Sequence, residues 1–357
     1  MGLQDGQLSA RQSRELSAFG QQDMFFQLSA LKATRMQRLK HVFESNPPRR
    51  LLLGPRIANL DPVIEGWQVE GLPEGFFEAS DPVQLNERCH HLGDAVVVVN
   101  NNDLGRTVSQ PMLCDFYARC ERTLFIGWDW DNHHWLDRST VLAAHTDLYA
   151  PGHQENLYLL TRYNASTIGP VYCASVQWSR QILCGRVPML LEQERSDAPL
   201  GMHIPYSQFS YRSRVVSTLS QQFPQVGFSA PSFHSRTEDQ RLLEWASHKA
   251  HWIVPVLNDV PIRIFDALIT GGIPLVPQSL RHLAPANNID RAHIVFYTPN
   301  DIIEPQAVVA RANALFDHGG ADGMMYRHRY ALDHHHGTTR LQQMLGFAAD
   351  EFGWVRP

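Results

Sequence analysis

The sequence predicts an α/β protein made of two Rossmann-like domains that face each other across a cleft. Three observations lead to this fold class. Apolar runs alternate with helix-like segments from residue 49 to about residue 150, and the alternation restarts near residue 171, with strands predicted at Val171–Val176 and Met189–Glu192. The four consecutive valines Val96–Val99 are typical of a strand that is covered on both faces, as in parallel sheets. The stretch Trp252–Ser279 has the pattern of a strand, a helix and a second strand.

The stretch Trp252–Ser279 contains the clearest of these patterns. The apolar run Trp252–Leu257 predicts a buried strand, and apolar residues then recur at helical spacing from Ile262 to Ile269. Gly271 and Gly272 end the helix, because glycine adopts the left-handed conformation at low steric cost. A second strand begins at Ile273. We expect a ligand site at the turn before the helix, since open α/β sheets bind ligands at the carboxyl ends of their strands.

Composition shifts along the chain suggest four segments. Residues 1–48 form a helical extension that ends at Pro47-Pro48, and they are followed by one Rossmann-like domain over 49–165, a second over 166–345 and a packing tail over 346–357. Two interpretations of the extension stay open. It is either a basic amphipathic arm, with Lys32, Arg35, Arg38 and Lys40, that touches a membrane surface or a partner, or a helix that packs on the first domain.

The overall composition is that of a globular protein. Hydrophobic residues make up 43% of the chain, charged residues 19%, and the net charge is −5, which argues against a general nucleic-acid binder. The five cysteines form no CxxC pair, the amino terminus lacks the features of a signal peptide, and no apolar run approaches the roughly 20 residues of a membrane span. We therefore expect a cytoplasmic protein with reduced thiols.

Several motifs of other enzyme classes are absent from the sequence. It contains no GxSxG, GxxxxGK[ST] or HExxH motif, and the glycines after the first predicted strand do not form GxGxxG. Although there are 18 histidines, the only HxH motif beside an acid is His334 and His336, next to Asp333. We predict no metal site, and His336 is alternatively the polar start of a helix.

The segment V-P-I-R-I-F-D-A-L-I-T-G-G-I-P-L-V resembles the carboxy-terminal nucleotide-sugar motif of GT-B glycosyltransferases, of the group 1 type. That motif reads Arg-x-Phe-Glu-Ala-Leu-x-x-Gly, and here Arg263, Phe265, Ala267 and Leu268 match it, while Asp266 stands where Glu is usual. The resemblance covers residues 170–345, whereas over 49–150 it is only architectural.

The resemblance implies a transferase that moves a sugar from a nucleotide-activated donor to a saccharide, lipid-linked or protein acceptor, as in polysaccharide biosynthesis, with no cofactor beyond the nucleotide-sugar co-substrate. It assigns the donor ribose to Asp266. In the retaining branch a second acid lies eight residues earlier, where this chain has Asn258. For the diphosphate we predict Arg180, Arg263 and the backbone at Pro261 and Ile262, because arginine forks and helix amino ends bind phosphate.

The acceptor and the catalytic base are expected in the first domain, in W-D-W-D-N-H-H-W, residues 128–135, or after the valine strand. The flat faces of Trp128 and Trp130 suit a sugar ring. The candidate bases are Asp103, Asp131, His133 and His134. The alternative is that the tryptophans pack in the core and the polar residues cap the next helix.

Other functions remain open at this level. A nucleotide-sugar epimerase or hydrolase would use the same architecture, and a non-catalytic sugar-binding or scaffold protein would explain the weakened pair Asn258 and Asp266. A metal-dependent hydrolase is a further alternative. The sequence does not indicate the oligomeric state.

Overall fold

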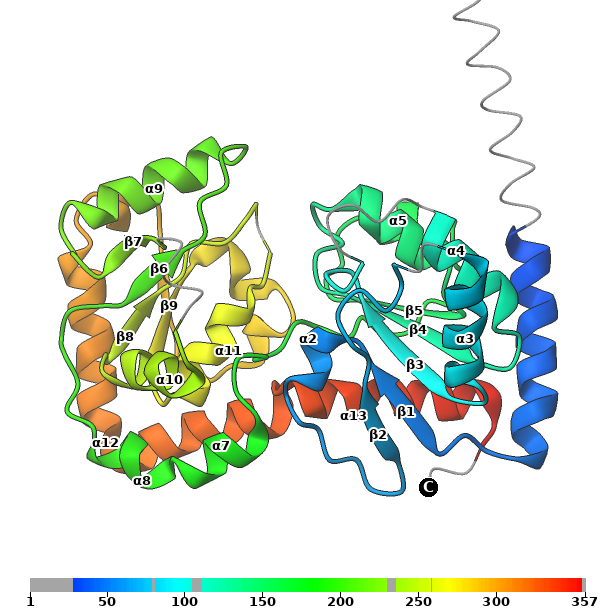
Figure 1. The fold of residues 1–357 in the computed structure, drawn as a ribbon. Coiled ribbons are helices and arrows are strands. Elements are labelled where there is room, and N and C mark those ends of the chain that lie inside the picture. Colours follow the sequence, from blue (N-terminus) through cyan, green and yellow to red (C-terminus); the bar gives the residue numbers. More distant parts are fainter. Residues whose placement is uncertain (1–27, 79–80, 105–110, 230–235, 258, 355–357) are drawn as a thin grey trace, which may run out of the picture. The chain divides into compact units, whose positions relative to one another are not determined.

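The computed structural model of the protein describes residues 28–78, 81–104, 111–229, 236–257 and 259–354. These residues form two compact units. The first contains the described residues up to Ala58, then Ile64–Val171 and the residues from Met344 onward, and the second contains Asn59–Val63 and Tyr172–Gln343. Figure 1 labels the elements of both units.

The sheet of the first unit consists of five parallel strands. The strands are β1 (Arg50–Leu53), β2 (Gln68–Gly71), β3 (Val96–Asn100), β4 (Leu124–Asp129) and β5 (Leu148–Pro151). Their order across the sheet is β2-β1-β3-β4-β5, with every neighbouring pair parallel. This is the 2-1-3-4-5 order of a doubly wound fold, and the strand order reverses between β1 and β3.

Helices pack on this sheet and contribute to the core of the first unit. They comprise residues 28–45, α2 (Pro55–Ala58), α3 (Pro82–Leu92), α4 (Pro111–Arg119), α5 (Leu136–Ala144) and α6 (Leu157–Leu160). The valines of β3 are fully buried, as predicted for a strand with two covered faces. On one face, Val97 and Val99 pack with Phe116 of α4 and Leu142 of α5.

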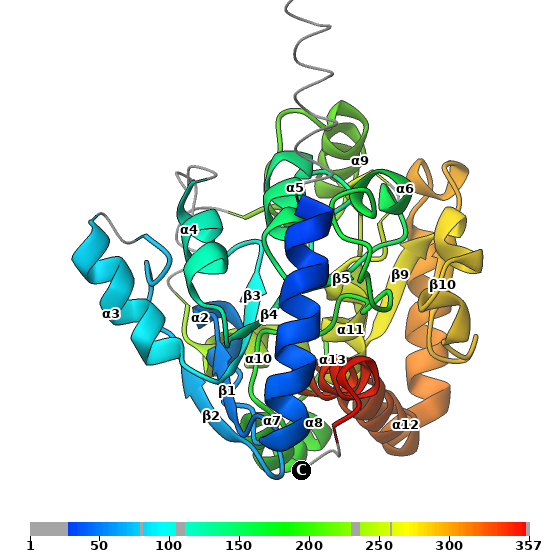
Figure 2. The same ribbon diagram turned by 90° about the vertical axis from the view of Figure 1, so that its right-hand side faces the viewer.

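The helix of residues 28–45 (dark blue in Figure 2) is fixed to the first unit by buried cations. Arg35 forms a buried ion pair with Asp147, at 2.9 Å from Nε to Oδ1, and also donates to the carbonyls of Tyr117 and Thr123. Lys32 donates to the carbonyls of Ala143 and Thr146, and burial lowers its pKa to about 7. Lys32 and Arg35 are therefore core residues, and of the two interpretations of the extension the one in which a helix packs on the first domain is correct for residues 28–45. Residues 1–27 lie outside the described part.

The second unit contains a smaller version of the same sheet. Strands β8 (Ala250–Trp252), β9 (Ile273–Pro277) and β10 (Val295–Tyr297) pair in the order β10-β9-β8, and β6 (Gly201–His203) pairs with β7 (Val226–Phe228). Leu200, directly before β6, bridges to β8, because its N–H donates to Ala250 O at 3.0 Å and its carbonyl accepts from Trp252 N at 2.7 Å. Numbered from its own first strand, this sheet also has the order 2-1-3-4-5.

The remaining helices belong mostly to the second unit. They are α7 (Arg180–Gly185), α8 (Val187–Glu192), α9 (Ser210–Ser220), α10 (Glu238–Ala246), α11 (Ile262–Ile269), α12 (Gln306–His334) and α13 (Gly337–Phe352), with short 3₁₀ turns at Gln278–His282, Ala286–Asn288 and Asn300–Ile302. Two repeated units with the doubly wound order confirm the predicted α/β class with two Rossmann-like domains. The predicted strand–helix–strand unit is β8–α11–β9, with β8 and β9 parallel and Gly271 at φ +81°.

Helix α13 is shared between the units. Its residues up to Gln343 belong to the second unit, and those from Met344 belong to the first. There Phe352 and Trp354 pack edge-on against Phe43 of the helix of residues 28–45, at 5.8 and 5.3 Å between ring centroids. Both ends of the described chain therefore meet in the core of the first unit.

Two predicted strands are absent from the described structure. Met189–Glu192 lies in α8, because Pro188 at the start of that helix fixes a helical φ and no β-branched residue follows it. Val171–Val176 is extended, but only Ser175 pairs, in a single bridge to His336. The prediction that His336 starts a helix is confirmed, since its Nδ1 accepts from Thr338 N in α13 and its Nε2 contacts Trp178 O.

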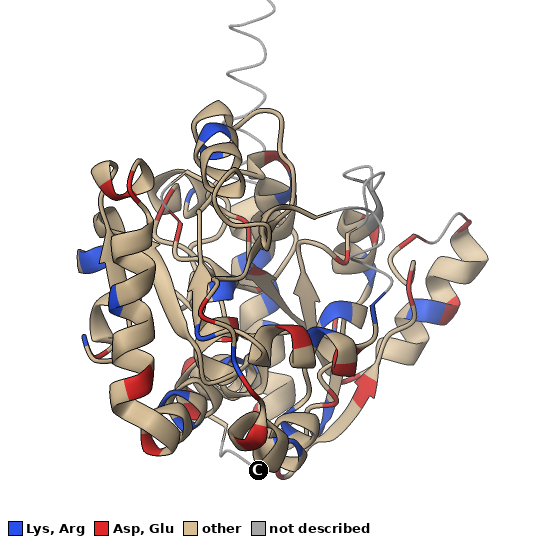
Figure 3. Cartoon of the chain, turned by 90° about the vertical axis from the view of Figure 1, so that its left-hand side faces the viewer, with Lys and Arg blue, Asp and Glu red and all other residues tan. Residues whose placement is uncertain are grey.

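Charged residues of both signs are interspersed along the helices of the second unit (Figure 3). Among the described residues, no helix combines the length and the hydrophobicity that a membrane span requires. The five cysteines are free thiols in the structure.

Replacing the buried arginine of the N-terminal helix should strongly destabilise the first unit. We expect Arg35→Met to lower the free energy of unfolding by about 3–5 kcal/mol, because Asp147 would stay buried without its cation. This corresponds to a fall of about 10 °C in the melting temperature, measured by calorimetry. Arg38→Met, which removes an exposed pair with Glu121, should change stability by at most about 1 kcal/mol. Similar losses in both variants would contradict the role of Arg35.

Candidate active-site residues in the two units

A cavity of about 250 Å³ lies at the carboxyl edge of the second sheet. Residues that follow three neighbouring strands form most of its wall, and helix α9 supplies the rest. The lining residues are Tyr211, Val215, Val254, Pro255, Leu257, Pro277, Gln278, Ser279, Tyr297, Pro299 and Ile302. The wall is largely apolar, and it has the amide of Gln278 as a group that both donates and accepts hydrogen bonds. Such a pocket suits a flat heteroaromatic group.

Two arginines lie beside this cavity. Arg212 donates from Nε to Val254 O at 3.1 Å, and Val254 also lines the cavity. Arg263 stands on the first turn of α11, is partly buried, and has no hydrogen bond or ion pair with another described residue. Burial lowers the pKa of both arginines, but each remains cationic at neutral pH. The carboxylates of Asp259 and Asp266 oppose the effect of burial on Arg263, but neither forms an ion pair with it, so its guanidinium donors stay open to a ligand.

The loop between β8 and α11 adds a titratable carboxyl group to this edge. Burial raises the pKa of Asp259 to about 7, although the charges of Arg212 and Arg263 oppose this shift. Pro261 precedes α11 in an extended conformation and has no N–H to donate. The predicted backbone donors are thus reduced to the first-turn N–H groups that begin with Ile262, and their role in binding stays a prediction. Asn258 lies outside the described residues.

Asp266 does not face the cavity as an open ribose ligand. Its carboxylate is 1% exposed and accepts a hydrogen bond from Ser175 Oγ at 2.7 Å and another from Gln177 Nε2. Burial raises its pKa to about 6, against the lowering effect of both bonds. Both oxygens are engaged within the protein in this conformation, and the contact of Asp266 with a ribose stays a prediction. Asp266 holds residues 175–177 against α11.

Arg180 is likewise committed elsewhere. Its guanidinium pairs with Asp333 at 2.9 Å and donates to Leu332 O at 3.0 Å, at the end of α12. It does not line the cavity. The prediction that Arg180 binds a diphosphate is therefore wrong, because α7 places this side chain on the end of α12. The structure does not bring His334 and His336 together as metal ligands. His336 is buried and hydrogen-bonded, whereas His334 is exposed.

The first unit carries a polar cluster at the corresponding edge of its sheet. The side chains of Asn101 and Asn102, which follow β3, donate to Asp131 Oδ2 at 2.8 and 3.1 Å. Asn101 also accepts from the N–H of Trp130 at 3.0 Å. The ends of β3 and β4 are thus joined by side-chain hydrogen bonds. The two amides therefore fix the orientation of the Asp131 carboxylate.

Asp103 lies where the strand order of the first sheet reverses. Its carboxylate accepts from the N–H groups of Asn100 at 2.9 Å and Arg56 at 3.2 Å, and so it ties the end of β3 to the segment after β1. A Cβ atom at Gly54 would lie only 1.8 Å from Asp103 Oδ2, so the approach requires glycine. Burial raises the pKa of Asp103 to about 6 against these hydrogen bonds. That value suits a general base near neutral pH.

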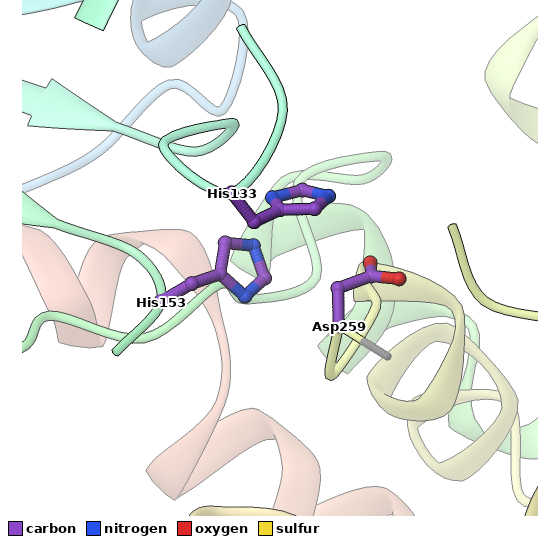
Figure 4. Close-up of side chains that lie close together, drawn as sticks. All are labelled: His133, His153 and Asp259. Atoms are coloured by element: carbon purple, nitrogen blue, oxygen red, sulfur yellow. The ribbon is translucent and has the colours of Figure 1, made fainter. Parts of the chain in front are cut away.

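The histidines of the same edge form a chain of rings. His134 Nδ1 lies 2.8 Å from His133 Nε2, and the rings of His133 and His153 are 4.2 Å apart (Figure 4). Figure 4 also labels Asp259, which belongs to the second unit. Burial lowers the pKa of His133 to about 2, of His153 to about 4 and of His134 below its usual value. Neutral imidazoles with such low pKa values are weak bases, so the structure favours Asp103 over His133 for this role.

The two tryptophans predicted to bind the acceptor are buried. Trp128 is 0% exposed, and its Nε1 donates to Val171 O at 3.1 Å. Trp130 is also buried and packs edge-on against Trp128 at 5.2 Å. Neither ring presents a free face to a sugar in this conformation. The alternative that these side chains pack in the core is therefore correct.

Sequence reasoning missed the residues that form the cavity of the second unit. Gln278 and Ser279 directly follow β9, and Pro299 follows β10. The rule that ligands bind at the carboxyl ends of parallel strands would have identified them if it had been applied to every predicted strand. His153 and Tyr211 carried no such signal, because each lies in a loop or helix of ordinary composition.

Comparisons with known proteins give a likeness of fold alone. No protein-family model and no curated protein matches the chain. An alpha,alpha-trehalose-phosphate synthase (UDP-forming) from Burkholderia vietnamiensis is similar, with a TM-score of 0.45 and 9% identity over 84% of this chain and 100% of that chain. The OtsA apo structure has a TM-score of 0.45 and 10% identity over 87% of this chain and 100% of that chain. A chain of the GtfA/B complex has a TM-score of 0.38 and 9% identity over 76% of this chain and 61% of that chain. Likeness at this level transfers no donor, acceptor or catalytic residue to this chain.

The raised pKa of Asp266 predicts how stability depends on pH. Between the ordinary aspartate pKa of about 3.9 and the folded value of about 6, the folded chain binds more protons than the unfolded chain. The contribution of Asp266 to stability is therefore fully present below pH 4 and is lost as the pH rises through 6, by about 3 kcal/mol. Asp266→Asn does not titrate, so the melting temperature of the wild type minus that of the variant should fall between pH 4.5 and pH 7.5.

A thermal unfolding series over this pH range tests the assignment. The exposed Asp322→Asn on α12 is the matched control, and its difference from the wild type should not change in this way. A pH-independent difference for Asp266→Asn would show that Asp266 is ionised in the folded protein at acidic pH.

Proposed function

We propose that the protein is a glycosyltransferase of the GT-B type. Its second unit binds a nucleotide-activated sugar, and the sugar is transferred to a saccharide, lipid-linked or protein acceptor without a metal ion. The observation that carries the proposal is the cavity at the carboxyl edge of β8, β9 and β10, together with Arg263 on the first turn of the helix that follows β8. An apolar recess and a guanidinium without a hydrogen bond to another described residue match the two halves of a nucleoside diphosphate.

The proposed donor chemistry follows from this pairing. The base would lie between apolar side chains such as Val254 and Tyr297, with Gln278 as its hydrogen-bonding partner. The diphosphate would face Arg263 and the first-turn N–H groups of α11, which favour negative charge. These groups would stabilise the leaving nucleoside diphosphate as the glycosidic bond breaks. Arg212 would support the site by holding the backbone at Val254.

For the acceptor we propose Asp103 as the general base of the first unit. Deprotonation of an acceptor hydroxyl is needed if the reaction inverts configuration, and the pKa of about 6 makes Asp103 mostly ionised at neutral pH. Asp131, held by Asn101 and Asn102, is the second carboxylate at this edge. A cytoplasmic role in polysaccharide synthesis is the biological setting that we infer from this chemistry.

Removing Arg263 should separate phosphate recognition from base recognition. We expect Arg263→Met to weaken the binding of nucleoside diphosphates by about 10- to 100-fold, the value of a charge-assisted contact, while binding of the matching nucleoside stays unchanged. Calorimetric titration of a panel of nucleoside diphosphates and nucleosides measures both. Arg186→Met is the control, because Arg186 is an exposed arginine of the same unit paired with Asp239. Failure of the wild type to bind any member of the panel would refute the donor site.

The pH profile of transfer tests the proposed base. The value of kcat/KM should rise about tenfold per pH unit below pH 6 and level off above it, since the base must be deprotonated. Asp103→Asn keeps an acceptor for only one of the N–H groups of Asn100 and Arg56, so its melting temperature is measured as well, and in the folded variant kcat should fall by about 10²- to 10⁴-fold. Asp94→Asn, which breaks an exposed pair with Arg122, should leave the rate unchanged. An unaltered rate in Asp103→Asn would rule this residue out.

Product analysis distinguishes the alternative enzymes on the same fold. A transferase consumes the donor only when an acceptor is present, a hydrolase releases free sugar without one, and an epimerase changes the sugar while the nucleotide stays attached. A protein that binds nucleotide but shows none of these reactions would be a binding or scaffold protein. Turnover that is insensitive to a chelator supports the proposed metal independence.

A further inference from the structure

Helix α12 is broken at Gly320. This residue has φ 50° and ψ −146°, a conformation that favours glycine, and an added Cβ atom would meet no other atom within 4 Å. A new helical segment therefore begins at Ala321. The first N–H groups of a helix have no acceptor within the helix, and they form the positive end of its dipole.

The buried guanidinium of Arg327 lies against this break. Arg327 is 1% exposed, and its Nη1 would be 3.2 Å from a Cβ atom at Gly323 and 3.7 Å from one at Gly319. Its Nε donates to Gly271 O at 2.8 Å, and Nη1 lies 3.4 Å from His293 Nδ1. Nη2 is buried and has no hydrogen-bond partner among the described residues. A donor is therefore left over at the glycine turn.

A second buried arginine lies close by. Arg195 is 9% exposed and donates from Nη2 to Thr270 O at 2.8 Å and to Leu190 O at 3.1 Å. Its Nε is also buried without a partner among the described residues. The Cζ atoms of Arg195 and Arg327 each lie 5.2 Å from the ring of Phe316.

The charge of this arginine pair is only partly balanced within the protein. Neither arginine has a carboxylate partner among the described residues, and both donate to backbone carbonyls, including those of Thr270 and Gly271 at the end of α11. The end of a helix supplies about half a negative charge, whereas the two guanidiniums carry two positive ones. Burial lowers the pKa of Arg195 to about 10 and of Arg327 to about 9, so both stay charged at neutral pH. Uncompensated buried charge is costly and favours a bound counter-ion.

We propose that the Gly319–Gly323 turn, Arg327 and Arg195 form a binding site for a phosphate group, separate from the donor cavity. The glycines let the guanidinium pack directly against the helix break, and the new helix start supplies N–H donors, which together suit a tetrahedral oxyanion. The ligand is free phosphate or the phosphate of a small phosphomonoester.

Thermal unfolding of the full chain in phosphate tests the site. Low millimolar inorganic phosphate should raise the melting temperature of the wild type by about 2 °C or more relative to chloride at equal ionic strength. Glycerol phosphate is a second probe, and a matching shift shows that the site accepts a phosphomonoester, whereas a shift with inorganic phosphate alone assigns it to the free ion. Low concentrations avoid the general stabilisation by excluded salts.

Variants of the turn locate the effect. Gly319→Val would fill the space beside Arg327 and should abolish the phosphate shift, while Gly185→Ala, at a glycine of α7 with open surroundings, should retain it. Arg327→Lys keeps the positive charge but removes the paired N–H donors of the guanidinium, and it should weaken phosphate binding at least about tenfold. This variant provides the test if Gly319→Val does not fold. Arg263→Met should keep the shift, because it alters only the donor cavity.

Three results would overturn the proposal. One is an equal stabilisation by chloride. Another is a phosphate shift that persists in both Gly319→Val and Arg327→Lys, which would leave the two arginines as a clamp on the end of α11. The last is a shift that disappears in Arg263→Met and persists in Gly319→Val, which would assign the phosphate to the donor cavity.

Discussion

Parallel strand pairing is the constraint on which the candidate sites of this protein depend. In a parallel sheet every strand ends at the same edge, so loops that are distant in the sequence are brought side by side there. In the second unit this edge collects the residues after β8, β9 and β10 into one cavity. In the first unit it joins the loops after β3 and β4 through Asn101 and Asp131. Helix packing fixes each sheet, but the pairing decides which side chains meet.

The electrostatics of both edges follow from the same geometry. Loops at the carboxyl ends of strands are packed by the helices that follow them, and carboxylates there lose much of their hydration. Burial raises the pKa values of Asp103 and Asp259 in such loops, and it also raises the pKa of Asp266 within α11. Their hydrogen-bond partners differ, however. Among the described residues, the donors to Asp103 are backbone N–H groups, whereas the donors to Asp266 are two side chains.

Local patterns were sufficient for the fold but insufficient for the site. The valines of β3 and the glycine stop after α11 are set by nearest-neighbour chemistry, and the sequence predicts both. The fates of Asp266, Arg180 and Trp128 depend on partners distant in the chain, namely Ser175, Asp333 and Val171, which no local spacing reveals. Met189–Glu192 shows the same limit at the level of an element, because a short apolar run suits a strand or a helix equally until its start is known.

The passage of α13 from one unit to the other has a consequence for the order of biosynthesis. Phe352 and Trp354 complete the aromatic packing around Phe43, so the core of the first unit includes residues that are distant from Phe43 in the sequence. During translation an amino-terminal domain ordinarily folds first, as soon as it has left the ribosome. Here the aromatic packing around Phe43 cannot form until Phe352 and Trp354 have been synthesised. The nascent first unit therefore exposes Phe43 until synthesis has reached Trp354.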